Sequence, residues 1–355
     1  MKLLFIGDFT SDFGPGMANK NLRAGFKNNQ NIFFYDTYGI NKKLRLKKIL
    51  SFKILSQIKR SDAVVFCSGT RLNSLLIHHA KFFRKPIFYI LHGLGTYESE
   101  LNGISISKKV LRHEKHLFRK VNRFFCVSKA FCDFMKQREQ KYQDKFDFNY
   151  NALDVEKIQT ITTAISDKTN IVRENNLIFS LGGGRRQKNN LRVCEAIQHL
   201  NQVEKMDLKY IVIGAVGKDT DEICKFNFVE YHNSLPNDQV LKIMQQSTLY
   251  IQNSIFESFG LAPFEALLAG SNLLVSKNVG ALGLLGDLID EDIIINQQDI
   301  NEIAAKIKYN LANHNAERLY ESIDIEMIKP DNVAINLMTK IQAYLEKSEV
   351  FINEN

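Results

Sequence analysis

The sequence predicts an α/β fold with parallel sheets, divided into about two domains. Short apolar runs rich in β-branched and aromatic residues alternate with helical patterns, as in sheets whose parallel strands are joined by helices. In each half, the first predicted strand runs into a glycine-containing loop and then a helix, an arrangement in which a ligand can approach the backbone. The 355 residues suffice for about two domains with a full core each.

The composition is that of an ordinary soluble protein. Hydrophobic residues make up 45% and charged residues 24% of the chain, and no apolar run approaches the roughly 20 residues of a membrane-spanning helix. The first nine residues, MKLLFIGDF, are interpreted as a strand rather than a signal peptide. Five cysteines without a Cys-x-x-Cys pair predict reduced thiols and a cytoplasmic protein.

The net charge of +8 is concentrated in the first half of the chain. Residues 1–165 contain 29 Lys and Arg against 13 Asp and Glu, whereas the remaining residues contain 18 against 26. A basic surface of this kind attracts nucleic acid or an anionic membrane. Because the sequence has no nucleic-acid-binding motif, we expect no nucleic acid partner and favour a membrane or lipid phosphate.

Two basic helical patterns bear on the membrane interpretation. Residues 41–60 contain six Lys, two Arg and no acid among regularly spaced Leu and Ile. This pattern fits a helix on an anionic bilayer, and it fits equally a surface helix packed on the sheet. Residues 107–123 form a second basic pattern, which favours the bilayer.

The first half contains six predicted strands, and two of the following loops carry candidate site residues. Gly14 and Gly16 follow the first strand in a Gly-Pro-Gly sequence, which is also an ordinary turn. His92 follows the fourth strand, at the carboxyl end where ligands bind in open α/β sheets, although a hydrogen-bonded turn histidine would look the same. The six strands are residues 2–8, 32–36, 63–67, 86–91, 124–127 and 146–150.

The second half opens with a strand and a basic, glycine-rich loop. Residues 182–188 read Gly-Gly-Gly-Arg-Arg-Gln-Lys and precede a helix. Unbonded N–H groups of a glycine run together with clustered cations suit a pyrophosphate. Lys188 and either Arg185 or Arg186 would supply the positive charge; the alternative is an exposed basic turn.

Further elements complete the α/β pattern of the second half. The Asp-x-Asp sequence at residues 219–221 is interpreted as helix capping, so we expect no metal site. Strands are predicted at 177–181, 209–214, 226–231, 249–253 and 272–276, and helices at 237–246, 300–311 and 333–346.

Residues 254–270, SIFESFGLAPFEALLAG, combine two acids with an apolar helix. The predicted helix is apolar almost all round except for Glu265, whose buried carboxylate needs a partner. Glu257 stands eight positions earlier, and the backbone N–H groups of residues 259–261 lie between the two acids. Such N–H groups beside two acids suit a ligand with phosphate and hydroxyl groups. The alternative is a core carboxylate paired with a distant Lys or Arg.

The sequence Glu257-Ser-Phe-Gly-Leu-Ala-Pro-Phe-Glu265, followed by Ala-Leu-Leu-Ala-Gly, resembles the signature of retaining GT-B glycosyltransferases of family 4. The resemblance extends to bacterial capsular and exopolysaccharide enzymes and covers nearly the whole chain. It implies a GT-B fold, in which two Rossmann-like domains face each other across a cleft.

The same resemblance implies a domain division. We expect an N-terminal acceptor-binding domain at 1–165 and a C-terminal nucleotide-sugar-binding domain at 170–330, joined by a polar linker near 155–175. The last helix, within 331–355, is expected to pack back on the N-terminal domain.

The resemblance also assigns roles to individual residues. It implies that Glu257 contacts the hydroxyls of the donor sugar, that Glu265 binds the ribose and that Lys188 binds the diphosphate. The family often has an acid after the equivalent of His92, where this chain has Gly93. It also has an Arg five positions before the lysine, where this chain has Gly183. The predicted catalytic residues are Glu257, His92, Lys188 and Arg185, and the predicted donor-binding residues are Gly14, Gly16, Gly183, Gly184, Arg186, Ser234, Leu235, Phe259, Gly260, Leu261 and Glu265.

The resemblance implies a retaining hexosyltransferase that uses a nucleotide diphosphate sugar without a metal or cofactor. With the basic first half, it predicts a glycan or lipid-linked acceptor in capsule, exopolysaccharide or lipopolysaccharide synthesis, and a cytoplasmic, peripheral position at the inner face of the cell membrane. The alternatives are a sugar-nucleotide epimerase of the same fold, or a catalytically silent GT-B subunit that binds a glycan or a partner.

Overall fold

The chain forms two compact units, each built around one parallel sheet. The computed structural model describes residues 1–11, 14–27, 29–38, 52–67, 71–168 and 171–353. Unit 1 consists of residues 1–96, 106–154 and 325–355, and unit 2 of residues 97–105 and 155–324. Each sheet has six strands, and the pairings between them are parallel. The predicted α/β class with parallel sheets is therefore confirmed.

The sheet of unit 1 has the strand order β2-β1-β3-β4-β5-β6. Its strands coincide with the six predicted ones to within two residues at either end. They are β1 (Leu3–Gly7), β2 (Ile32–Asp36), β3 (Ala63–Phe66), β4 (Ile87–Leu91), β5 (Arg123–Cys126) and β6 (Phe146–Phe148).

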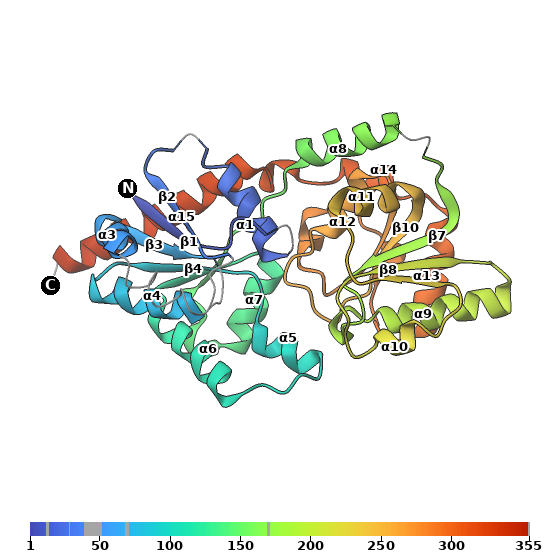
Figure 1. The fold of residues 1–355 in the computed structure, drawn as a ribbon, viewed down its shortest axis with the longest axis horizontal. Coiled ribbons are helices and arrows are strands. Elements are labelled where there is room, and N and C mark those ends of the chain that lie inside the picture. Colours follow the sequence, from blue (N-terminus) through green and yellow to red (C-terminus); the bar gives the residue numbers. More distant parts are fainter. Residues whose placement is uncertain (12–13, 28, 39–51, 68–70, 169–170, 354–355) are drawn as a thin grey trace. The chain divides into compact units, whose positions relative to one another are not determined.

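Helices cover both faces of this sheet (Figure 1). One face carries α1 (Pro15–Ala24) and α15 (Pro330–Asn353), which pack against each other. Gly25, at the end of α1, permits this close approach, because a Cβ there would lie 2.9 Å from Cβ of Ala334. As predicted, the last helix thus returns to the unit built from the first half of the chain. Among the described helices, none has an apolar stretch long enough to cross a membrane.

The other face of unit 1 carries the helices that follow β2, β3 and β4. They are α3 (Phe52–Arg60), α4 (Arg71–Phe82) and α6 (Lys108–Lys120), and α3 and α6 each pack on α4. Of the predicted basic helix at 41–60, residues 41–51 lie outside the described residues. The remainder is α3, whose Ile54 and Ile58 are fully buried. This part of the pattern therefore fits the alternative of a helix packed on the protein.

The sheet of unit 2 has the strand order β12-β11-β10-β7-β8-β9. Five of its strands were predicted; the two-residue β12 is too short to give a sequence pattern. The strands are β7 (Glu174–Leu181), β8 (Lys209–Ile213), β9 (Val229–His232), β10 (Ser247–Gln252), β11 (Asn272–Ser276) and β12 (Ile293–Ile294).

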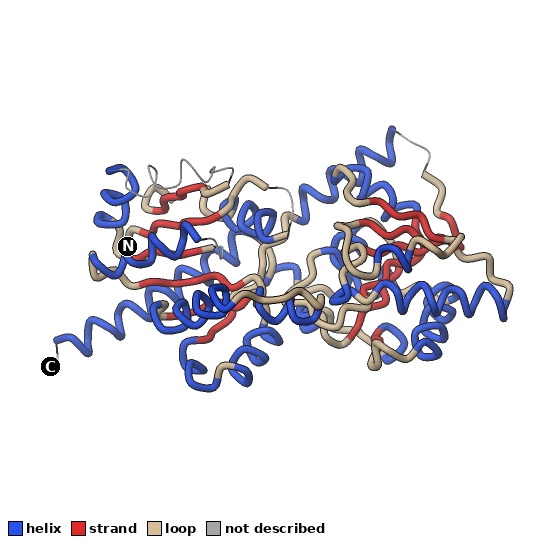
Figure 2. The backbone as a smooth tube through the Cα atoms, turned by 60° about the horizontal axis from the view of Figure 1, so that its bottom comes forward, coloured by secondary structure: helices blue, strands red, loops and turns tan. Residues whose placement is uncertain are grey.

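Two helical layers enclose the sheet of unit 2, as Figure 1 and the turned view in Figure 2 show. The side chains of α9 and α13 pack with those of β7, β8 and β10 to form its core. One layer consists of α8 (Val155–Lys168), α11 (Asn237–Gln246), α12 (Ala262–Leu268) and α14 (Ala316–Glu321). The opposite layer consists of α9 (Asn190–His199), α10 (Thr220–Ile223) and α13 (Ile300–Ala312).

The segment 155–175, expected to be a polar linker, is mostly helix α8 of unit 2. Ile158 and Thr162 are buried on its inner face. The side chain of Gln245, on α11, donates a hydrogen bond to the Thr162 carbonyl at 2.9 Å. The many Thr and Ser residues of this helix weaken its apolar period, so the sequence pattern did not reveal it.

In both units the strand order reverses next to the first strand of the unit. In unit 2 the chain runs from β7 to β8 and β9 on one side, whereas β10, β11 and β12 continue on the other. The loops after β7 and β10 therefore diverge at the carboxyl edge of the sheet, the position where open α/β sheets bind ligands. In unit 1 the same reversal separates β1 from β3.

Candidate functional site

The loops that follow β7 and β10 are joined by Gln187, a buried residue that sequence reasoning did not identify. Its carbonyl accepts a hydrogen bond from the N–H of Ile255 at 2.8 Å, and its side-chain amide donates to the carbonyl of Phe256 at 2.8 Å. The side chain of Asn102 also contacts Gln187, accepting from its N–H at 3.2 Å. Gln187 therefore fixes the position of its neighbour Lys188 relative to Glu257.

Lys188 and Glu257 form an ion pair at this edge of the sheet. Lys188 Nζ donates to Glu257 Oε2, and the two side chains are only 14% and 17% exposed. The side-chain amide of Gln252, on β10, donates to the same oxygen at 3.2 Å. The structure thus brings together two of the predicted catalytic residues within unit 2.

The glycine run differs from its prediction. The N–H groups of Gly182 and Gly183 donate to the Ile213 carbonyl at 2.8 and 3.2 Å, and that of Gly184 donates to the Tyr231 hydroxyl at 2.9 Å. The expectation that these three N–H groups are bare and converge on a pyrophosphate is therefore wrong.

The glycines serve close packing instead. Gly182 and Gly183 have φ angles of 115° and 62°, which strain any other residue type. A Cβ on Gly182 would lie 2.8 Å from Cδ of Lys188, so this glycine leaves room for the lysine stem.

The two arginines of the loop have different environments. Arg186 Nε pairs with Asp219 at 3.2 Å. Arg185 Nε donates to the Gly182 carbonyl at 3.3 Å, and its exposed guanidinium pairs with no acid among the described residues. Asp219 makes no side-chain capping bond to the helix that follows it, so the capping explanation for Asp219 is replaced by its pairing with Arg186.

The segment between the two acids presents two unbonded amides. Phe259 is 2% exposed and belongs to the core. Gly260 has a φ of 93°, a left-handed conformation that favours glycine. The N–H groups of Gly260 and Leu261 donate to no described residue. Part of the predicted amide array is thus present.

Glu265 is a partly buried acid, and none of the described residues forms a hydrogen bond or ion pair with its carboxylate. Burial raises the pKa of Glu265 from 4.5 to about 7. No Lys or Arg of the described residues pairs with Glu265, which argues against the alternative of a core ion pair. An acid kept without a partner at such a cost in solvation indicates a ligand-binding role.

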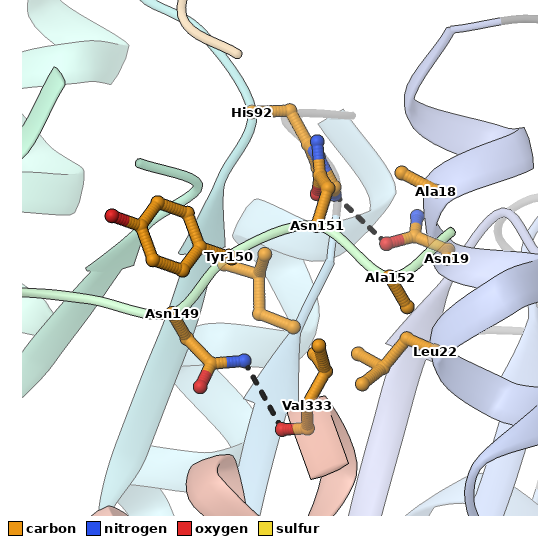
Figure 3. Close-up of a pocket in the computed structure, with 10 residues that line it drawn as sticks. Ala18, Asn19, Leu22, His92, Asn149, Tyr150, Asn151, Ala152 and Val333 are labelled. Atoms are coloured by element: carbon orange, nitrogen blue, oxygen red, sulfur yellow. Dashed lines mark hydrogen bonds between the residues drawn. The ribbon is translucent and has the colours of Figure 1, made fainter. Parts of the chain in front are cut away.

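In unit 1, His92 and Asn19 meet at the corresponding reversal of strand order. Their side chains line a small pocket together with residues 149–152 and Val333 (Figure 3). Asn19 Nδ2 donates to the carbonyls of Asp8 and Cys67, both at 3.0 Å. Since both amide hydrogens are used, Asn19 Oδ1 accepts from His92 Nε2 at 2.8 Å.

This bond fixes the state of His92. Nε2 carries the proton, and burial lowers the pKa of His92 to about 4. At neutral pH His92 is therefore an uncharged imidazole. Asn19, fully buried in the middle of α1, is a site residue that the sequence did not indicate.

The glycines of the first loop have separate reasons for their identity. Gly14 has a φ of 49°, and a Cβ there would have no described residue within 4 Å. A Cβ on Gly16 would lie 3.0 Å from Cβ of Ser11. Ser11 is itself held by Asp8, which accepts from its hydroxyl at 2.6 Å and from its N–H at 3.0 Å. Gly16 thus permits tight packing of the loop.

Ser234 and Leu235, predicted to read a nucleotide base through their backbone, lie in the turn between β9 and α11. Ser234 is exposed and Leu235 half-buried. Their N–H groups donate to no described residue, as a backbone reading site requires. Their role stays a prediction.

Comparison with known proteins relates this arrangement to glycosyltransferases. Residues 162–323 match the family model described as Glycosyl transferases group 1. The matched range is somewhat less than half of the chain, lies within unit 2, and contains Lys188, Glu257 and Glu265. The comparison with curated protein sequences gave no match.

Solved structures similar to this chain cover nearly all of it. The complex of HepE from Anabaena with UDP-glucose has a TM-score of 0.67 at 14% identity, covering 96% of this chain and 100% of that one. Sucrose-phosphate synthase from Thermosynechococcus elongatus has 0.67 at 14%, covering 98% and 100%. Trehalose 6-phosphate synthase from Burkholderia multivorans has 0.65 at 10%, covering 99% and 98%. The chain therefore has the predicted GT-B fold with two Rossmann-like domains.

Proposed function

We propose that this protein is a retaining glycosyltransferase that moves a hexose from a nucleotide diphosphate sugar to an acceptor hydroxyl. The observation that carries the proposal is the carboxylate of Glu265, which has no partner among the described residues. It lies in the same unit as the Lys188–Glu257 pair and within the range that matches group 1 glycosyltransferases. The likeness to HepE with bound UDP-glucose supports a sugar nucleotide as donor.

The chemistry that these residues offer is electrostatic. Departure of a nucleoside diphosphate builds negative charge on its terminal phosphate. In this proposal Lys188 and Arg185 stabilise that charge, together with the N–H groups of Gly260 and Leu261, which donate to no described residue. Because these groups supply positive charge without a metal, metal independence is part of the proposal. Retention of configuration rests on the family resemblance alone.

Two carboxylates complete the proposed donor site. Glu265 accepts the ribose hydroxyls, which gives its carboxylate the partners that no described residue supplies. Glu257 accepts hydroxyls of the donor sugar. His92, a neutral imidazole in unit 1, is proposed to contact the sugar.

A nucleotide panel tests this function. UDP, GDP and ADP, each with its glucose conjugate, are added to the protein in the presence of a chelator. We expect one nucleotide to raise the melting temperature, because a ligand that binds only the folded chain stabilises it by about 2.7 kcal/mol at 100 times its Kd. Absence of binding by every nucleotide, also in calorimetry, would contradict the proposal. Conversion of the sugar nucleotide without acceptor into an epimer would favour an epimerase.

We further propose a glycan or lipid-linked acceptor of cell-surface polysaccharide synthesis, at the cytoplasmic face of the membrane. The outer surface of α6 supports a membrane contact. Lys108, Lys109 and Arg112 are exposed there beside Val110 and Leu111, which are 47% and 39% exposed. Basic residues around exposed apolar ones suit an anionic bilayer surface.

Charge reversal of α6 tests the membrane contact. Lys108, Lys109 and Arg112 are changed to Glu, and binding to vesicles of phosphatidylcholine with phosphatidylglycerol is measured by sedimentation. Each basic residue contributes about 1 kcal/mol, so affinity should fall roughly 100-fold or more. Reversal of the exposed Lys205, Lys209 and Lys225 of unit 2 is the control with the same net charge change. Equal losses in both variants would argue against a specific contact through α6.

A further inference from the structure

Two polar residues of β10, Tyr250 and Gln252, are buried next to Glu257. They are 0% and 4% exposed, and the residues paired with them on β11, Leu273 and Val275, are apolar. The Tyr250 hydroxyl donates to Gln252 Oε1 at 3.0 Å, and Gln252 Nε2 donates to Glu257 Oε2 at 3.2 Å. Burial of a phenol and an amide is costly without such bonds, so the three side chains form one hydrogen-bonded network.

The direction of these hydrogen bonds is determined by their chemistry. An ionised carboxylate only accepts, so Gln252 must turn its NH₂ group toward Glu257 and its oxygen toward Tyr250. Tyr250 must then be the donor. Burial, reinforced by the carboxylates of Glu257 and Glu265, raises the pKa of Tyr250 well above its ordinary value, so the phenol keeps its proton.

These contacts leave one oxygen of Glu257 available. Lys188 and Gln252 both bind Oε2, and Oε1 contacts no hydrogen-bond donor among the described residues. Gly260 packs over this pair, since a Cβ on it would lie 3.3 Å from Gln252 Nε2 and 3.3 Å from Glu257 Cγ. The carboxylate is therefore held in one orientation with one unoccupied acceptor.

We propose that Gln252, held by Tyr250, is a positioning residue that orients Glu257 so that its Oε1 accepts a hydroxyl hydrogen of the donor sugar. This inference rests on the proposed function and deepens it, because it assigns sugar selection to the Tyr250–Gln252–Glu257 network. The nucleotide part of the donor is bound by Glu265 and Lys188, so it does not need Gln252.

The experiment compares UDP with UDP-glucose in wild type, Gln252→Leu and Tyr250→Phe. Gln252→Leu should leave the Kd of UDP unchanged within about twofold. The kcat/KM for UDP-glucose should fall roughly 10- to 100-fold, as expected for loss of a hydrogen bond to a charged group. Tyr250→Phe should give a smaller loss of the same kind, because the amide remains. Melting temperatures verify that both variants are folded.

A double-mutant cycle separates positioning from a structural role. In a Glu257→Ala background, Gln252→Leu should change kcat/KM by less than about twofold, because its target is gone. In Gln252→Glu, activity relative to wild type at the same pH should recover as the pH falls, since the introduced carboxyl can donate to Glu257 only when protonated.

The outcomes are distinguishable. If Gln252→Leu weakens UDP and UDP-glucose equally, and does so also without Glu257, the positioning role is overturned while the glycosyltransferase proposal stands. If wild type binds neither UDP nor any other nucleotide of the panel, the proposed function fails and this inference fails with it.

Discussion

Replacement of Glu265 by Gln is expected to stabilise the folded protein at pH 8 and at the same time to weaken nucleotide binding strongly. Burial raises the pKa of Glu265 from 4.5 to about 7. Between these two values the folded chain holds a proton that the unfolded chain has released. Stability therefore falls as pH rises through this window and remains lower above pH 7. The neutral amide removes this cost, which amounts to up to about 3 kcal/mol.

Whereas Glu265→Gln should stabilise the folded protein, it should weaken the binding of a nucleotide. An ionised carboxylate accepts two hydroxyl hydrogens of a ribose, whereas the amide offers one oxygen and an unsuitable NH₂ group. Loss of charge-assisted hydrogen bonds should weaken UDP roughly 100-fold or more. Wild-type affinity should also decrease as the pH falls below 7, because the carboxylate becomes protonated. Denaturation at pH 5 and pH 8, with calorimetry of UDP at both, measures these effects.

Glu302 provides a matched control on the same unit. Burial alone would raise the pKa of Glu302. The pKa nevertheless lies below its ordinary value, because the carboxylate accepts hydrogen bonds from the N–H groups of Ile295 and Asn296 and contacts Lys306. Glu302→Gln should therefore destabilise the protein at pH 8 and leave UDP binding unchanged. If Glu265→Gln instead behaves like Glu302→Gln, Glu265 is a structural acid and the donor site lies elsewhere.

The fold could be predicted because its signals are local. Each of β1, β3 and β4 is a short, fully buried apolar run, which is recognisable without knowledge of its neighbours. The two acids of the 254–270 segment were also recognisable, because they stand out in an apolar stretch. The position of His92 at the carboxyl end of its strand followed from parallel topology alone.

The partners of these residues could not be predicted, because they come from distant parts of the chain. Gln187 binds Phe256, 69 positions later, and Asn19 binds Cys67, 48 positions later. Nothing in the sequence distinguishes Gln187 from an exposed glutamine. The N–H groups of the glycine run were expected to be bare, but the neighbouring strand β8 satisfies two of them through the Ile213 carbonyl.

Lys188→Met is expected to reduce turnover of the sugar nucleotide by roughly 100- to 1000-fold, the range found when one transition-state stabilising group is removed. Lys188 Nζ is the cation placed by Gln187 at the edge of the sheet, and its ion pair with Glu257 is shielded from water. Its charge therefore acts on the leaving diphosphate with little screening. Release of UDP from UDP-glucose, with and without an acceptor mixture, measures the rate.

The two arginines of the same loop supply the comparison for this prediction. Arg186 forms an ion pair with Asp219, so its charge is partly neutralised and Arg186→Met should change turnover by less than about tenfold. Arg185 has no acid partner among the described residues, so Arg185→Met should fall between the other two variants. A turnover loss in Arg186→Met as large as that in Lys188→Met would show that Asp219 releases its arginine to the ligand. Full activity of Lys188→Met would remove the lysine from the mechanism and leave the departing charge to Arg185 and the N–H groups of Gly260 and Leu261.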